Sequence, residues 1–160
     1  MIEDQRFKTL RHIETVRNYL NTIIHQLLAR AELHDQTKLQ DPERPYFDKY
    51  TPLLRDLKYG SEEYRNCLKE MMPAIEHHNK HNRHHPEFFK NGIEDMNLID
   101  LIEMLCDWKA AGLRHTTGDL IKSIEINEMR FGLSFQLVCI LKNTAKLLND
   151  SQTYHHADES

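Results

Sequence analysis

The chain has 160 residues, a formal net charge of −4 and a sequence pI near 6.2. This length suits one domain with a hydrophobic core and is short for two. The mildly acidic charge argues against a surface built to bind nucleic acid or membrane lipids. The three cysteines form no CxxC pair, which favours a reducing compartment over a disulfide framework or a thiolate zinc site. We expect Cys67, Cys106 and Cys139 to be inert core thiols.

The N-terminal residues MIEDQRFKTLRHIE lack an apolar signal segment, and no run of about 18 apolar residues occurs, so we expect a cytoplasmic protein. Apolar residues at three- and four-residue spacing then predict a long first helix, because this spacing places them along one helical face. The stripe consists of Phe7, Leu10, Ile13, Val16, Leu20, Ile23, Ile24, Leu27, Leu28 and Ala31. A polar segment with three prolines follows and predicts a loop and a short helix over about residues 46–57.

Four more helices are predicted in the remaining chain. Ser61 is the expected N-cap of a helix towards residue 80, and Asn97 is the expected N-cap of a helix to about residue 113. A further helix over residues 119–131 ends at Gly132, and the last helix begins at Ser134 and continues to about residue 148.

The predicted fold class is all-α, because no segment alternates between apolar and polar residues as a strand does. We expect a single-domain bundle of about six helices over residues 1–149. The last residues, 150–160, lack periodicity and predict a flexible C-terminal tail.

Histidines are concentrated in the segment HHNKHNRHHPEFF, where five occur within nine positions. His78 continues the inward face of its helix, three residues after Ile75 and seven after Met71. His77 points about 100° away from that face. The density suggests a metal site, whereas the alternative is a solvated polar patch in which only some of the histidines bind.

An acidic stripe borders the packing face of the helix after Asn97. It consists of Asp100, Glu103 and Asp107, at positions i, i+3 and i+7. One interpretation is an exposed stripe whose charge is balanced by Lys109 and Arg114. The other is that Asp107, which lies next to Trp108, is held rigidly as an oxygen ligand of a metal ion.

The segment LHDQTK directly follows the first helix. Adjacent His34 and Asp35 can offer one ion an imidazole nitrogen and a carboxylate oxygen, and such mixed donors suit divalent Mn, Fe, Co, Ni or Zn. The alternative is a helix C-terminus with His34 near the dipole and Asp35 starting a turn. His12 lies beside the apolar stripe of the same helix, 22 residues before His34.

The order of these motifs resembles the HD-domain superfamily of metal-dependent phosphohydrolases, in which a His, an HD pair and a later Asp lie on an all-helical scaffold. HDQTK resembles the HDxxK form of members with two metals, where further histidines lie between the HD pair and the final Asp. Taken together, HIETV, HDQTKL, HHNKHNRHHPEFF and MNLIDLIEMLCDWKAA are similar to a small uncharacterised family found in bacteria and their phages, over roughly residues 5–145. That family has no function to carry over.

The resemblance implies one or two divalent transition metal ions as cofactor. The implied ligands are His12, His34, Asp35 and Asp107, with His78, His85 and His84 as candidates for a second ion. Asp35 would orient the nucleophile, and Lys38 would act beside it in catalysis unless it is a surface lysine. The candidates for binding substrate phosphate are Lys38, Arg83, Lys109 and Arg11.

The expected function is that of a metal-dependent phosphohydrolase that acts on a nucleotide or related small phosphate ester through metal-activated water. One alternative is an HD-type di-iron oxygenase, and another is a metal-stabilised helical adaptor without enzymatic activity. The expected partner is a small-molecule phosphate substrate, with no membrane and no strong nucleic-acid signature. Whether the protein is a homo-oligomer stays open.

Overall fold

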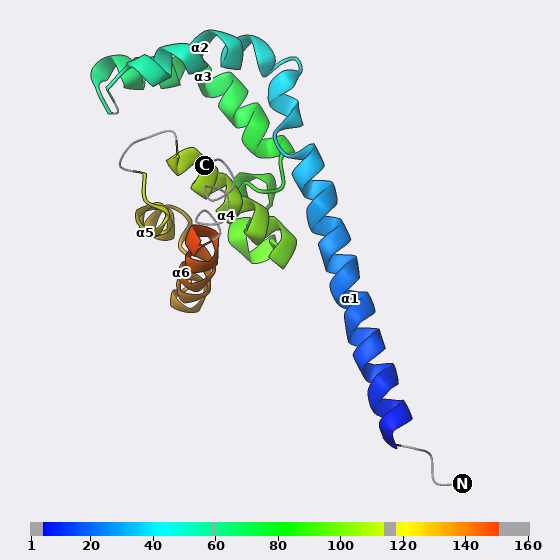
Figure 1. Cartoon of the computed structure of the whole chain (residues 1–160). Helices are drawn as coiled ribbons and strands as arrows, with labels where there is room; N and C mark the ends of the chain where they lie inside the picture. Colours follow the sequence, from blue (N-terminus) through cyan, green and yellow to red (C-terminus); the bar gives the residue numbers. More distant parts are fainter. Residues whose placement is uncertain (1–4, 59, 114–117, 151–160) are drawn as a thin grey trace, which may run out of the picture. The chain divides into compact units, whose positions relative to one another are not determined.

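The chain is described by a computed structural model that covers residues 5–58, 60–113 and 118–150. These residues form α-helices joined by loops and short 3₁₀ helices, without a strand among them, so the all-α prediction is confirmed (Figure 1). The α-helices are α1 (Gln5–Leu33), α2 (Arg44–Asp56), α3 (Glu62–His81), α4 (Leu98–Gly112), α5 (Leu120–Phe131) and α6 (Phe135–Asp150). The 3₁₀ helices are η1 (Gln36–Leu39), η2 (Pro86–Phe88) and η3 (Gly92–Asp95).

The chain divides into two compact units, Met1–Gln36 and Thr37–Ser160, where the sequence predicted a single domain. The first unit contains one long helix, α1, as predicted (Figure 1). A lone helix has no second element in its unit to cover its apolar stripe. Accordingly α1 has no buried residue, and Leu10, Leu20 and Leu28 are each more than half exposed.

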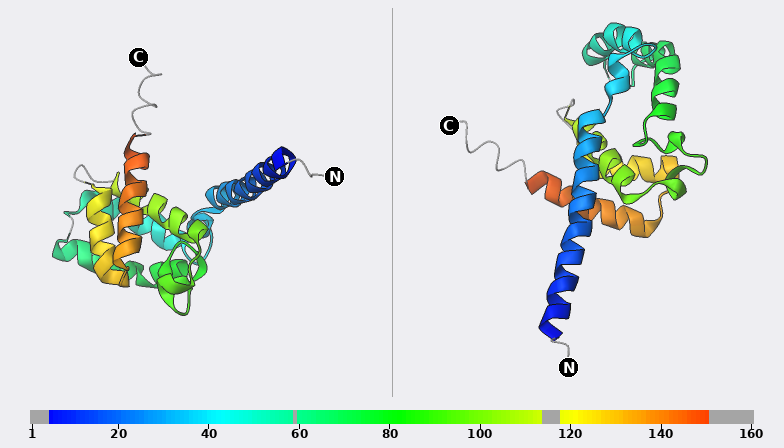
Figure 2. Two further views of the ribbon diagram at one scale, coloured as in Figure 1. Left: turned by 90° about the horizontal axis from the view of Figure 1, so that it is seen from below. Right: turned by 90° about the vertical axis from the view of Figure 1, so that its right-hand side faces the viewer.

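The second unit, Thr37–Ser160, has two hydrophobic clusters. In the first, α2 packs against α3 through Tyr50, Cys67 and Met71. In the second, α4, α5 and α6 meet, and α5 and α6 lie side by side in the left view of Figure 2. The second cluster is built from Leu105, Leu120, Ile124, Leu133, Val138, Leu141 and Ala145. These clusters fix the elements that hold the candidate site.

The predicted helix starts are confirmed by their capping hydrogen bonds. Ser61 Oγ accepts from the backbone N–H of Tyr64 at the start of α3. Asn97 forms a capping box with Asp100, in which each side chain accepts from the other residue's backbone N–H. At the C-cap of α5, Gly132 has φ +64°, a left-handed conformation that glycine adopts without the clash of a Cβ.

The cysteines differ in exposure. Cys67 is buried, as predicted, but Cys106 is exposed, so the prediction of a core thiol there is wrong. The preceding residues, Met104 and Leu105, occupy the buried face of α4, and the next residue points about 100° away from Leu105. The predicted tail at 150–160 lies outside the described residues beyond Asp150. Among the described helices, none combines the length and hydropathy that crossing a bilayer requires.

Candidate metal centre

Three histidines of the second unit come together at the end of α3. His78 lies in the last turn of α3, and His84 and His85 lie in the short segment before η2. Each offers one ring nitrogen, and these nitrogens all lie within 4.8 Å of one another. The ring centroids are 5.6 Å apart for His78 and His84, 4.9 Å for His78 and His85, and 4.2 Å for His84 and His85. We call these three residues the histidine triad.

The triad is shielded from water. His78 and His84 are 3% and 2% exposed, and the Nε2 atoms of all three histidines are buried. Buried polar residues at such a density cost free energy unless hydrogen bonds or a bound ion compensate them. The rings therefore need hydrogen-bond partners from the chain. The positions of these partners show how the rings are oriented.

Buried carboxylates hold the Nδ1 side of two rings. Glu43, fully buried just before α2, contacts His78 Nδ1 through Oε2 at 2.9 Å. Glu103 of α4 contacts His84 Nδ1 through Oε1 at 3.2 Å. A carboxylate accepts, so each Nδ1–H donates, and in the neutral form of such a ring the lone pair lies on Nε2. This carboxylate–histidine arrangement is the one that orients metal-binding histidines in proteins.

His85 completes the triad as a neutral ring. Its buried Nε2 makes no hydrogen bond within the described residues. Burial lowers the pKa of His85 to about 3, helped by the nearby rings of His84 and His78. Asp107 acts in the opposite direction, and Lys38 adds to the lowering. At neutral pH the imidazole is therefore uncharged, which is the form that binds metal ions.

The segment that carries His84 and His85 is anchored on both sides. Asn82, the C-cap of α3, donates through Nδ2 to the carbonyl of His78 at 2.9 Å and to Thr37 Oγ1 at 2.9 Å. Arg83 donates twice to the fully buried Asp100 of α4, from Nε to Oδ1 at 3.1 Å and from Nη2 to Oδ2 at 2.9 Å. These bonds fix the two histidines relative to α3 and α4.

The donor set of the triad fits a metal ion. Three imidazole nitrogens suit borderline ions such as Zn, Fe, Co or Ni better than Mg or Ca, which prefer oxygen. With metal–nitrogen bonds of about 2.0–2.1 Å, nitrogens on one tetrahedral ion lie about 3.4 Å apart. Nitrogens within 4.8 Å of one another need to approach by at most about 1.4 Å to reach this spacing.

Asp107 and Lys38 lie near enough to the triad for their charges to act on the pKa of His85. Both side chains are half-buried. The Lys38 Nζ also lies 5.3 Å from the centre of the Phe47 ring, a cation–π distance. The predicted acidic stripe on α4 is thus a partly buried set of carboxylates that contact Arg83 and His84, and the alternative of an exposed stripe is wrong.

The predicted ligands His12, His34 and Asp35 belong to the first unit. His12 is exposed on α1, and His34 directly follows the end of that helix. A continuous helix rises about 1.5 Å per residue, so the 22 residues between the two histidines span about 33 Å. The prediction that His12 and His34 hold the same ion within one chain is therefore wrong.

His34 and Asp35 do lie close together, with His34 Nε2 at 3.6 Å from Asp35 Oδ2. Asp35 has φ +59°, a left-handed conformation that Asp adopts more readily than most residues. This conformation ends the helix at the HD pair, as the turn interpretation expected. The roles of His34 and Asp35 as ligands, and of Asp35 in catalysis, stay predictions.

The predicted phosphate-binding residues have different surroundings. Arg83 is bound to Asp100 and lies over the Phe89 ring at 4.8 Å, so it has an anchoring role, and its contact with phosphate stays a prediction. Arg11 lies near the start of α1, with its guanidinium 4.8 Å from the Phe7 ring centre. Lys109 is half-buried on α4, two residues after Asp107, and its role stays a prediction.

Sequence reasoning missed Glu43, Thr37 and Asn82. Glu43 lies 34 and 35 residues before the histidines that it contacts, so no local pattern links them. Glu87, which directly follows the histidine cluster in the sequence, accepts from Arg130 Nη2 at 2.8 Å. One signal is present in the sequence. Glu43 lies in the charged run DPERP, directly before a predicted helix, and is not part of the polar face of any predicted helix.

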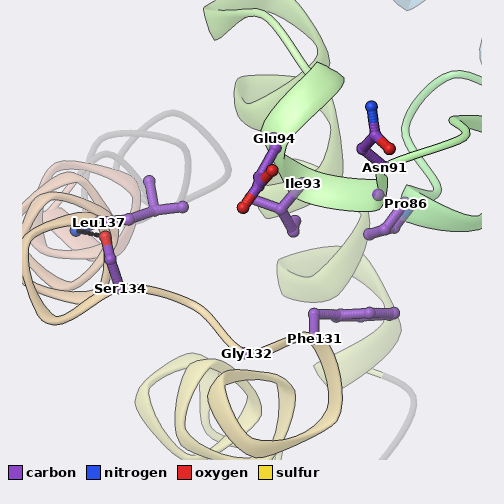
Figure 3. A pocket seen from close by; sticks show the side chains of 9 residues that line it. Pro86, Asn91, Ile93, Glu94, Phe131, Gly132, Ser134 and Leu137 are labelled. Atoms are coloured by element: carbon purple, nitrogen blue, oxygen red, sulfur yellow. Dashed lines mark hydrogen bonds between the residues drawn. The ribbon is translucent and has the colours of Figure 1, made fainter.

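A separate hollow lies between η3 and the α5–α6 turn. It is lined by Pro86, Asn91, Gly92, Ile93, Glu94, Phe131, Gly132, Ser134 and Leu137 (Figure 3). Figure 3 also shows Ser134 Oγ accepting from the Leu137 backbone N–H, the cap that starts α6. No triad histidine lines this hollow, so it is distinct from the candidate metal centre.

The comparisons with known proteins identify a family without a known function. The family described as "Family of unknown function (DUF5662)" matches residues 1–150. The chain therefore belongs to DUF5662. Neither the curated proteins nor the solved structures contain a match to it.

Proposed function

We propose that this DUF5662 protein is a metal-dependent hydrolase of a nucleotide or another small phosphate ester. The observation that supports the proposal best is the histidine triad, whose Nδ1 atoms are held by buried carboxylates at His78 and His84. A merely structural polar cluster would be satisfied by hydrogen bonds among its own members. Here two buried carboxylates contact the Nδ1 atoms of His78 and His84, the arrangement that orients metal-binding histidines in other proteins.

In this proposal His78, His84 and His85 hold one divalent transition metal ion. When bound, such an ion lowers the pKa of a coordinated water and neutralises charge that develops on a phosphoryl group. Three protein ligands leave a coordination position for water or substrate, as catalytic sites do, whereas structural zinc sites use four. The number of histidines in the triad therefore supports a catalytic site.

The remaining polar groups near the triad fit a phosphate substrate. Lys38 provides a positive charge for a non-bridging phosphate oxygen. Asp107 provides a carboxylate that can orient the attacking water and accept its proton. The charges of both residues act on the same ring, His85. In this proposal the cation binds the anionic substrate and the carboxylate activates the water.

The experiment is phosphate release from a panel of nucleotides by the full-length protein, after metal removal and reloading with Mn, Co, Ni or Zn. We expect turnover that follows metal content and that falls at least 100-fold in Asp107→Asn. In Lys38→Met we expect mainly a higher KM. A control variant, His25→Ala, alters an exposed histidine of α1 and should leave turnover unchanged.

Stoichiometric metal binding without phosphate release from any member of the panel would overturn the proposal in favour of a non-enzymatic role. Iron binding accompanied by oxygen uptake would overturn it in favour of an oxygenase. A chain that binds none of the four metals would remove its basis altogether.

A further inference from the structure

The apolar stripe of α1 is exposed along nearly the whole helix, which runs without a break over Gln5–Leu33 (Figure 1). Eight large apolar side chains of the stripe are each more than 40% exposed. They are Phe7, Leu10, Ile13, Val16, Leu20, Ile23, Ile24 and Leu28. Single exposed apolar residues are ordinary on protein surfaces, whereas a continuous stripe indicates a surface that binds another molecule.

The area of this stripe is larger than a monomeric protein usually leaves in water. With about half of each side chain exposed, the eight residues present on the order of 800 Å² per chain. The largest apolar patch of a typical monomer measures about 300–600 Å². A stable protein–protein interface takes about 800 Å² from each partner. The stripe therefore has the area of one side of such an interface.

The spacing within the stripe is that of a helix that packs against another helix. Ile13, Val16, Leu20, Ile23 and Leu27 follow one another at alternating steps of three and four residues. We call these five residues the seam. An average step of 3.5 residues keeps one apolar seam directed at a partner helix, as in coiled coils. The expected partner is therefore another helix with an apolar face of similar length.

The polar side of α1 fits a protein partner better than a lipid surface. Helices that lie on anionic membranes carry Lys and Arg along their polar face. Residues 18–29 of α1 contain neither Lys nor Arg, and the polar residues there are Asn18, Asn21, Thr22, His25 and Gln26. The middle of the helix therefore lacks the charges that would attract lipid headgroups.

We propose that α1 pairs with α1 of a second copy of this chain, so that the two apolar stripes cover each other. A two-fold axis makes such an interface self-complementary, because each copy contributes the same surface. The second copy presents a stripe of the required length, spacing and area. This interface lies in the first unit, and its existence does not depend on metal binding or hydrolase activity.

The charges of α1 favour an antiparallel pair. In a parallel pair each seam residue meets its own copy, and Arg6 and Arg30 continue the seam, seven residues before Ile13 and seven after Ile23. Each arginine would then face a like charge, which costs free energy. In an antiparallel pair the basic first turns approach the end of the other helix, which carries Glu32, and the two helix dipoles are opposed.

The test is sedimentation equilibrium of the full-length protein, whose chain mass is 19.1 kDa. We expect wild type to form a species of twice this mass. Leu20→Asp places a charge in the middle of the seam and should weaken the dimer at least 10-fold. The matched control is Asn18→Asp, which adds the same charge about 200° away on the helix and should leave the dimer unchanged.

A second variant separates the loss of the interface from the loss of the helix. Ile13→Ala combined with Leu20→Ala removes apolar area while introducing the residue that favours helices most. This variant should also weaken the dimer at least 10-fold. Orientation is tested with Ile13→Cys in a protein whose Cys67, Cys106 and Cys139 are replaced by alanine. An antiparallel pair keeps the two introduced thiols apart, so we expect no disulfide between the copies under oxidation.

Three results would overturn the proposal. A wild-type protein that stays monomeric at its highest soluble concentration would mean that the stripe is covered within its own chain. Binding of the monomer to vesicles of phosphatidylserine and phosphatidylcholine, lost in Leu20→Asp, would assign the stripe to a membrane. A dimer of equal strength in wild type, Leu20→Asp and the double alanine variant would place the interface elsewhere. An efficient disulfide in Ile13→Cys would overturn the antiparallel arrangement.

Discussion

Two adjacent histidines of α3 have opposite surroundings. His78 is buried and joins His84 and His85, whereas His77 is one-third exposed and stacks on His81. A helix turns by about 100° per residue, so neighbouring residues point to different surfaces. Both rings nevertheless contact the same carboxylate, Glu43. Helical phase, and not residue type, therefore separates a buried candidate centre from a surface pair within one run of histidines.

The largest expected effect comes from removing a member of the buried group. His78→Ala should weaken metal binding by the triad more than 100-fold, because it deletes a proposed ligand and leaves Glu43 buried without one of its donors. An uncompensated buried polar group of this kind costs on the order of 1–3 kcal/mol of stability. Titration calorimetry and thermal unfolding of the metal-free protein measure the two effects. Unchanged tight binding in this variant would mean that His78 is not a ligand.

The helices were predictable because their signals are local. The starts of α3, α4 and α5 follow from Ser61, Asn97 and Asp119, whose side chains cap the helix within three residues. The apolar stripe of α1 also predicted a helix correctly. The expectation that this helix forms one domain with the other helices could not be derived in the same way. The periodicity of an apolar face predicts the helix but does not identify the surface that packs against it.

The candidate site was predictable only in part. The inward face of α3 singles out His78 from the sequence alone, since the face is defined by neighbours one and two turns away. Its support by Glu43 depends on a contact across 35 residues, which no local spacing encodes. The grouping of His12 with His34 came from a resemblance in motif order. That grouping is wrong for one chain because α1 continues without a break between them.

A smaller effect is expected from changing the carboxylate that joins the two groups. In Glu43→Gln the amide oxygen can still accept from one histidine, but the amide nitrogen would face the Nδ1–H of the other, donor against donor. One ring must then change its tautomer. We expect metal affinity to fall about 10–100-fold, as for other residues that orient ligands. Imidazole ¹⁵N chemical shifts report the tautomers of His77 and His78 directly.

Glu103→Gln is the matched variant for this test, because Glu103 contacts His84 Nδ1 as Glu43 contacts His78 Nδ1. It should weaken metal binding by the triad and leave the ¹⁵N chemical shifts of His77 unchanged, whereas Glu43→Gln should alter both. Equal binding by wild type and Glu43→Gln would show that the carboxylate does not select the tautomer.

The anchor of the triad segment should have a mainly structural effect. Asp100→Asn removes one charge from a bidentate pair with Arg83, whose side chain is 41% exposed. Breaking a fully buried pair costs about 3–5 kcal/mol, and the exposure of Arg83 reduces this to about 2 kcal/mol. Denaturant unfolding measures the loss. Metal affinity should fall only a few-fold, since the ligands remain, and a loss as large as in His78→Ala would show that the anchor sets the geometry of the site.

The smallest effect expected is the pH dependence that burial of His85 gives to the metal-free protein. Burial lowers the pKa of this ring from 6.5 to about 3, with the nearby His84 and His78 contributing. Between these values the unfolded chain binds a proton that the folded chain does not, so stability rises with pH across this window and falls as the pH decreases below 6.5. From pH 7.5 to pH 5.5 the loss should be about 1 kcal/mol.

His85→Asn should flatten the profile measured by denaturant unfolding, while His81→Ala, in the surface pair, should leave it as in wild type. If the stability of both variants keeps the wild-type pH dependence, another group is responsible. His85 would then not differ from the surface histidines in its effect on stability.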